Sequence, residues 1–149
     1  MNDSAIKSRA AVFSETDLVW GCSDGCRFRD PRDGRVYEFS ASGRIRFSVF
    51  DEALFREKFL CLYPACADRE ELRFWLRDHF RAPAERFLTS ALSDCGYTME
   101  TLYEMTEHRL HRLSRIFYGK AKNVFAAYGM ELASDCETDA VSNFVLIDR

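Results

Sequence analysis

The sequence has little glycine and proline, with only seven and three of these residues among 149. Collagen-like and low-complexity chains are rich in both residue types, so these two classes are excluded. No apolar run approaches the roughly 18 residues of a membrane-spanning helix, so we expect no membrane association. The N-terminus also lacks the basic and apolar stretches of a secretory signal, and we therefore expect a cytoplasmic protein.

The chain also has no excess of basic residues, because its formal net charge is -3. Proteins that coat nucleic acid nonspecifically are usually basic overall, so the total charge argues against that role. The distribution of charge is uneven. Residues 107–122 carry five basic residues against one acidic residue, and residues 131–149 carry five acidic residues against one basic residue. We expect this acidic tail and the basic helix before it to neutralise each other partly inside one fold.

Aromatic residues are abundant, at 14% of the chain, and they include 13 phenylalanines. Disordered chains are poor in aromatic residues, so this content indicates a folded protein. A chain of this length can bury about 68–70% of its unfolded surface. We therefore expect one domain over residues 1–149, with residues 1–11 mobile.

The N-terminal third of the sequence predicts mainly β-structure. A short helical turn is expected over residues 14–20, and a three-stranded antiparallel meander over Cys26–Phe50. Residues 30–34 and 40–43 are typical of its two tight turns, because proline, glycine and serine favour turn conformations. Apolar and polar residues alternate along the last strand, as they do in a half-buried strand. The apolar positions are Ile45, Phe47 and Val49.

Helical periodicity follows from residue 51 onward and predicts about four helices. The last and longest is expected over residues 98–128, with Gly129 as its C-cap. Such a helix would be a rod of roughly 46 Å, long enough for its end to pack against a second copy in a homodimer. The apolar run at residues 144–147 predicts a C-terminal strand that returns to the sheet. The predicted fold class is therefore α+β.

Six cysteines are present, and four of them occur in two closely spaced pairs that could supply a tetrahedral zinc shell. These pairs are Cys22 with Cys26 and Cys61 with Cys66. The alternative is that they are core thiols, since buried free cysteine behaves as a small hydrophobic residue. We expect no disulfide framework, because cytosolic thiols stay reduced.

The three histidines offer few catalytic arrangements. Glu104, His108 and His111 would share one helical face, which suits a metal or acid–base site, or else an exposed face with ordinary ion pairs. Neither a nucleophile elbow nor a phosphate-binding glycine loop is present in the sequence. We therefore expect no catalytic residues and no cofactor, although an enzyme of another type remains an alternative.

Arginines show the clearest pattern of candidate binding residues. Four of them recur at four-residue steps along the second predicted helix, namely Arg69, Arg73, Arg77 and Arg81. A second group on the last predicted helix contains Arg112 and Arg115. The outer face of the predicted sheet adds Arg27, Arg29, Arg44 and Arg46. Such surfaces suit an acidic protein or phosphates, unless they are only solvated faces.

These patterns lead to one hypothesis and two alternatives. We expect a small non-catalytic binding protein, a regulator or inhibitor of phage or mobile-element type, that contacts a protein partner through surfaces rich in arginine and aromatic residues. The first alternative is a nucleic-acid-binding protein that uses the same arginines. The second is a zinc- or thiol-dependent protein built on the two cysteine pairs.

Overall fold

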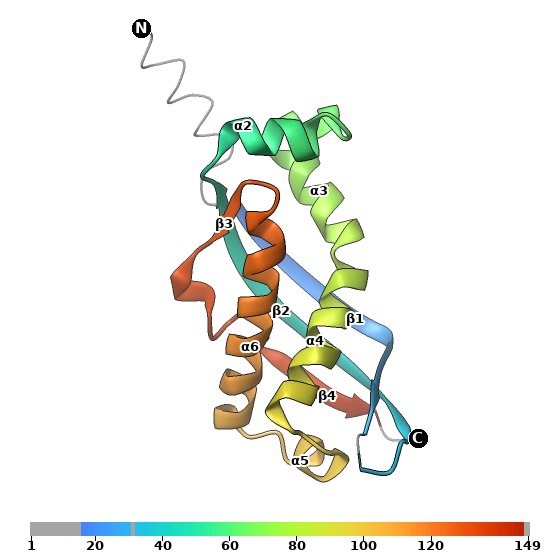
Figure 1. The fold of residues 1–149 in the computed structure, drawn as a ribbon. Helices are drawn as coiled ribbons and strands as arrows, with labels where there is room; N and C mark the ends of the chain where they lie inside the picture. The colour runs from blue at the N-terminus through green and yellow to red at the C-terminus, as the bar shows by residue number, and fades with distance from the viewer. Residues whose placement is uncertain (1–15, 31, 148–149) are drawn as a thin grey trace, which may run out of the picture.

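A four-stranded antiparallel sheet forms one layer of the structure, a computed structural model that describes residues 16–30 and 32–147 (Figure 1). Its strands are β1 (Thr16–Arg29), β2 (Val36–Val49), β3 (Met130–Leu132) and β4 (Asn143–Ile147). The central strand β2 pairs with β1 on one side and with both β3 and β4 on the other. The predicted α+β class and the returning C-terminal strand are both confirmed.

Helices α3, α4 and α6 cover one face of this sheet, and α2 lies across one end of the molecule (Figure 1). The helical elements are α2 (Glu52–Phe55), the π-helical turn η1 (Arg56–Leu60), the 3-10 turn η2 (Pro64–Ala67), α3 (Arg69–His79), α4 (Arg81–Cys95), α5 (Met99–Tyr103), α6 (Glu107–Ala126) and the 3-10 turn η3 (Ser134–Cys136). None of the helices in the described residues is both long enough and apolar enough to cross a membrane.

The predicted three-stranded meander is wrong in detail, because the chain forms one long two-stranded hairpin instead. Residues 16–20, expected as part of a helical turn, belong to β1, and residues 40–43 continue β2 without a turn. The alternation of buried and less buried residues runs unbroken through this stretch of β2. Gly43 serves close packing here, since a Cβ at this position would overlap the backbone carbonyl of Ala140. The one hairpin turn that forms has Gly34 at a positive φ of 73°.

The predicted helix over residues 98–128 is divided into α5 and α6. The backbone leaves the helical conformation at Glu104, and the Thr106 hydroxyl then accepts a hydrogen bond from the Arg109 N–H at 3.2 Å. A threonine cap offers the backbone an alternative to a continuous helix, and this favours the break. The remaining 20-residue helix α6 is only about 30 Å long and packs against α4 of the same chain. The long rod that suggested a homodimer is therefore not formed.

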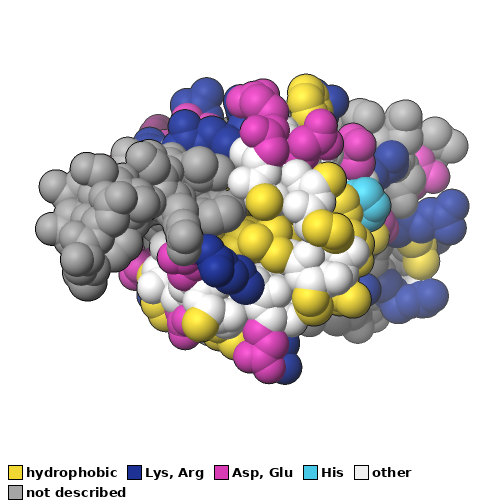
Figure 2. All heavy atoms as spheres, turned by 90° about the horizontal axis from the view of Figure 1, so that it is seen from above, with side chains coloured by type: hydrophobic (Ala, Val, Ile, Leu, Met, Phe, Trp, Pro, Cys, Tyr) yellow, Lys and Arg dark blue, Asp and Glu magenta, His cyan; other side chains and the backbone are white. Residues whose placement is uncertain are grey.

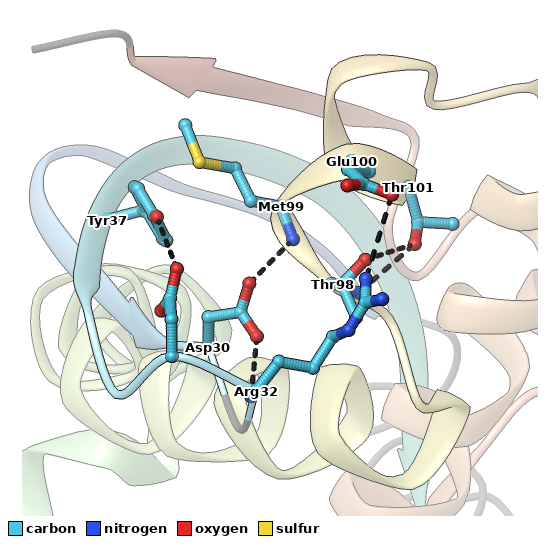
Figure 3. Close-up of polar contacts among 8 residues, drawn as sticks. Asp30, Arg32, Tyr37, Thr98, Met99, Glu100 and Thr101 are labelled. Carbon is cyan, nitrogen blue, oxygen red and sulfur yellow. Dashed lines mark hydrogen bonds and ion pairs between the residues drawn. The ribbon is translucent and has the colours of Figure 1, made fainter.

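Asp30 fastens the hairpin turn to the start of α5 (Figure 3). Its two carboxylate oxygens accept hydrogen bonds from the backbone N–H groups of Arg32, at 2.8 Å, and Met99, at 3.1 Å. The residue is only 4% exposed. These donors stabilise the ionised form, with the Arg32 N–H the largest cause, and lower the Asp30 pKa below its usual value.

The core lies between the sheet and the three covering helices and is rich in aromatic rings. The Trp20 ring of β1 stacks on Phe117 of α6 with centroids 5.0 Å apart. Its indole N–H donates to the Ala140 carbonyl at 2.7 Å, which satisfies the one polar group that this large side chain buries. The sheet is thereby joined to α6 and to the segment before β4.

Candidate functional site

An apolar pocket of about 250 Å³ lies among η1, α3, α4 and α6 and is the leading candidate site. Its walls are mainly aromatic, and side chains from each of these elements contribute. They include Phe59, Tyr63, Trp75, Phe87, Phe125 and Tyr128. Ligand sites are usually concave and mostly apolar, with a few polar groups that set orientation.

Helix α6 packs closely against α4. The elements η1 and α3 border the pocket mainly with aromatic side chains. The Phe59 ring meets Trp75 edge to face at 5.0 Å and Tyr128 edge to face at 6.0 Å. The Tyr63 ring lies 4.6 Å from Trp75. Aromatic pairs prefer edge-to-face and offset arrangements of this kind, and these rings form the walls of the pocket.

The rim of this pocket exposes large hydrophobic side chains to solvent. Leu62 is 66% exposed and Val124 is 41% exposed. Figure 2, which views the molecule from the end that carries α2, shows hydrophobic side chains gathered on this face and bordered by charged groups. Exposed apolar side chains gathered on one face mark a binding surface more often than a single exposed hydrophobic residue does.

Two polar side chains, His79 and Arg86, also line the pocket. The His79 ring stacks on Trp75 with centroids 4.3 Å apart, and its Nδ1 lies 2.8 Å from the Trp75 carbonyl oxygen. Because a carbonyl only accepts hydrogen bonds, Nδ1 must carry the proton in this contact. The ring therefore keeps Nε2 for a further hydrogen bond, and the sequence interpretation gave this histidine no binding role.

None of the three histidines hydrogen-bonds with a serine, threonine or cysteine side chain within the described residues. His108 is exposed, and His111 lies 3.8 Å from the Glu107 carboxylate. Glu104 lies outside α6, so the predicted helical face that it shares with the two histidines does not form. The metal or acid–base site suggested for Glu104, His108 and His111 is therefore wrong. The cause is the break in the helix before Thr106.

The arginine stripe Arg69, Arg73, Arg77 and Arg81 does not follow a single helix, because α3 ends at His79 and Arg81 begins α4. Arg73 and Arg77 line a shallow groove between α3 and β1, beside the exposed ring of Phe74. The Arg77 guanidinium lies 5.2 Å from the centre of that ring, and Arg73 forms an ion pair with Glu70 at 3.2 Å. The structure thus leaves these two guanidinium groups at the surface, on the side of α3 away from the pocket.

Arg112 and Arg115 lie in the first half of α6, at the end of the molecule opposite α2 and the start of α3 (Figure 1). Arg112 packs over the Tyr97 ring at 6.0 Å, and Arg115 forms an ion pair with Glu137 at 3.8 Å. The second contact is consistent with partial neutralisation between the basic helix and the acidic tail. The two arginine groups therefore do not form one continuous surface.

The four candidate zinc-binding cysteines also separate into two places. Cys22 and Cys26 are joined in a disulfide within β1, contrary to the expectation of reduced thiols. Cys61 is exposed and Cys66 is buried, both between η1 and α3. Within the described residues, the group of side chains that comes close enough to share a metal ion contains Cys22, Cys26 and Glu85 of α4. The four-cysteine shell, given as an alternative to core thiols, does not form among the described residues. Glu85 was missed because its contact with Arg27 spans about sixty residues.

No family model, curated protein or solved structure matches this chain. Its function is therefore inferred from its own residues, and the pocket beside Trp75 is the feature most specific to binding. Phe59 and Trp75 lie in segments with helical periodicity, and that pattern predicts only which residues are buried. It cannot reveal that their rings border an open space.

Proposed function

We propose that this protein is a non-catalytic binding protein, of regulator or inhibitor type, that holds an apolar side chain of a protein partner in its aromatic pocket. The observation that carries this proposal is the combination of aromatic walls with an exposed apolar rim, provided by Leu62 and Val124. Hot spots in protein interfaces are often bulky side chains seated in well-packed pockets of this type.

The volume of the pocket favours a side chain over a free small molecule. Ligand pockets usually measure about 300–1,000 Å³, and this pocket of about 250 Å³ lies just below that range. A leucine or phenylalanine side chain fits such a space, and the surrounding rim then contacts the partner's backbone and neighbouring residues. His79 and Arg86 also line the pocket, and in this proposal they hydrogen-bond with polar groups of the partner beside that anchor.

The arginines of α3 extend the proposed contact surface beyond the pocket. Arg73 and Arg77 lie on the opposite side of the same helix, together with Phe74, which is 49% exposed. Arginine and aromatic residues are enriched in protein interfaces, whereas lysine and glutamate are depleted. A partner that bridges α3 would therefore place its apolar anchor on one side of the helix and its acidic residues on the other.

Site-specific photo-cross-linking tests the proposal. A photoreactive phenylalanine analogue at Leu62 should cross-link to a defined apolar residue of one partner from the native host. The same analogue at Val145, which is 59% exposed on β4, is the matched control and should not. The purified partner should then bind the Val124→Glu variant at least about tenfold more weakly, since a charge would be buried at the rim. Cross-linking of the same partner from both positions, or unchanged binding by Val124→Glu, would contradict the proposal.

Salt dependence separates this proposal from nucleic-acid binding by the same arginines. Binding to duplex DNA should weaken steeply with salt, with a log–log slope near -0.9 for each phosphate neutralised. We expect no such binding at physiological salt. A steep slope that is reduced by Arg73→Gln and Arg77→Gln would favour nucleic acid as the partner.

A further inference from the structure

We propose that Cys22, Cys26 and Glu85 form a binding site for a thiophilic divalent cation of the zinc type when the bond between the two cysteines is reduced. The inference is independent of the aromatic pocket. It rests on a local irregularity in β1 that brings two sulfur atoms and one carboxylate together.

The irregularity is a bulge that opens between the two cysteines. Cys22 lies opposite Ala41 and Cys26 lies opposite Phe39, so β1 advances four residues while β2 advances only two. The two additional residues of β1 bulge out of the ladder, and the two cysteine Cα atoms lie 6.4 Å apart. Both side chains point to the helix-covered face of the sheet, where both cysteines are at most 1% exposed.

Glu85 reaches this pair from the first half of α4. One of its carboxylate oxygens and both sulfur atoms all lie within 4.8 Å of one another. The backbone N–H of Arg27 donates to Glu85 Oε1 at 3.3 Å, which orients the carboxylate beside the sulfur atoms. Outer hydrogen bonds of this kind commonly fix the orientation of metal ligands.

This donor set matches the chemistry of zinc better than that of magnesium or calcium. Thiolates are soft ligands that select zinc and similar ions, whereas magnesium and calcium prefer oxygen alone. Two thiolates and one carboxylate would supply three ligands, and water would occupy the fourth position. A bound cation would also compensate the negative charge that two deprotonated thiols bring into a buried site.

The disulfide and the metal site exclude each other. A dithiol reductant supplies two electrons and two protons, becomes a disulfide itself, and leaves a thiol on Cys22 and on Cys26. Binding of one divalent cation then releases those two protons, because only thiolates coordinate the metal. In the cytoplasm, where we expect this protein, thiols are normally kept reduced.

The other cysteines provide internal controls. Burial raises the pKa of the Cys66, Cys95 and Cys136 thiols. Among the described residues, none of these three belongs to the group of metal-ligating side chains that lie within 4.8 Å of one another. Cys61 is exposed, and its thiol lies 2.8 Å from the Glu57 carbonyl oxygen. Replacement of Cys61 by serine should therefore leave a metal bound at the β1 bulge unchanged.

Cadmium titration of the phosphine-reduced full-length protein under anaerobic conditions tests the site. Cadmium bound to thiolates absorbs in the ultraviolet, so one equivalent should produce this band and zinc should displace it. Cys22→Ser and Cys26→Ser should abolish the band, Glu85→Gln should weaken binding at least about tenfold, and Cys61→Ser should change nothing. No saturable band, a band that survives Cys22→Ser, or full affinity in Glu85→Gln would overturn the assignment.

A second readout needs no variant and so does not depend on whether the cysteine variants fold. Zinc should protect Cys22 and Cys26 of the reduced wild-type protein from alkylation, while Cys61 stays reactive. Peptide mass spectrometry identifies which thiols are protected. Protection of any other pair, or alkylation of both bulge cysteines at the same rate with and without zinc, would also overturn the proposal.

Discussion

At the scale of single residues, a few side chains have roles that depend on one close approach. Gly43 is required because the segment before β4 passes directly over β2 and leaves no room for a Cβ. Trp20 donates to the carbonyl of Ala140 in that same segment. His79 is held against Trp75 by stacking and by one hydrogen bond, which fixes its ring at the edge of the pocket. The contacts of Gly43 and Trp20 join parts of the chain that are distant in sequence, whereas His79 and Trp75 lie four residues apart on α3.

Two glycine substitutions test the close approach at Gly43. Gly43→Ala should destabilise the protein by about 1–3 kcal/mol, because a new methyl group is forced against the Ala140 backbone. The matched control is Gly119→Ala in α6, where a Cβ meets no atom within 4 Å. It should stabilise the protein by about 0.5–1 kcal/mol, since alanine is the better helix former. Urea unfolding measures both changes, and equal effects would contradict the packing argument.

At the scale of elements, the ends of helices and strands decide where functional groups lie. The break before α6 removes Glu104 from the helical face of His108 and allows α5 to meet the hairpin turn. The end of α3 at His79 places this histidine at the pocket. The bulge in β1 brings its two cysteines together. The break before α6 coincides with the cap made by Thr106, and the bulge contains two residues of β1 beyond those that β2 matches.

The cap of α6 can be tested by Thr106→Ala. Loss of the hydroxyl that accepts from the Arg109 N–H should reduce the free energy of unfolding by about 1 kcal/mol. Ser93→Ala in α4 is the control, because this exposed serine lies inside a helix, where alanine is favoured. Chemical denaturation should show a loss for the first variant only. If Thr106→Ala is as stable as the wild type, the Thr106 cap does not stabilise the start of α6.

At the scale of the whole molecule, the sheet and the helical layer are joined at both ends. Asp30 ties the hairpin turn to α5 (Figure 3), and aromatic rings from η1, α3 and α6 line the pocket at the opposite end. The pocket opens among η1, α3, α4 and α6.

The tie made by Asp30 predicts a specific dependence of stability on pH. The pKa of Asp30 is lowered in the folded protein. Its ionised form therefore stabilises the fold fully at a pH well above 3.8, the usual pKa of this group. That contribution is lost as the pH falls from this value through the lower folded pKa. We expect Asp30→Asn to be less stable than wild type at neutral pH, with the difference shrinking in this acidic window. Thermal unfolding across pH measures it, and a difference that is constant down to the lowest pH would refute the assignment.

The sequence by itself determined the α+β class, the C-terminal strand and most helix positions, because burial imposes a period of two on strands and of about 3.6 on helices. Ile45 and Phe47 show that period clearly. Local sequence patterns failed to predict the structure where the same residues are compatible with two conformations. Serine and glycine at 40–43 suit both a turn and a close-packed strand, and only Ala140 lying over Gly43 decides between them.

Tertiary structure alone decided which candidate residues meet. Arg73 and Arg112 belong to similar patterns but lie on different parts of the surface, since helix direction is set by packing. Glu85 approaches Cys22 and Cys26 only because α4 crosses β1 at the bulge. The pocket beside Trp75 likewise depends on how η1, α3, α4 and α6 are arranged around it. No periodicity encodes such distances, because they depend on contacts between segments far apart in the chain.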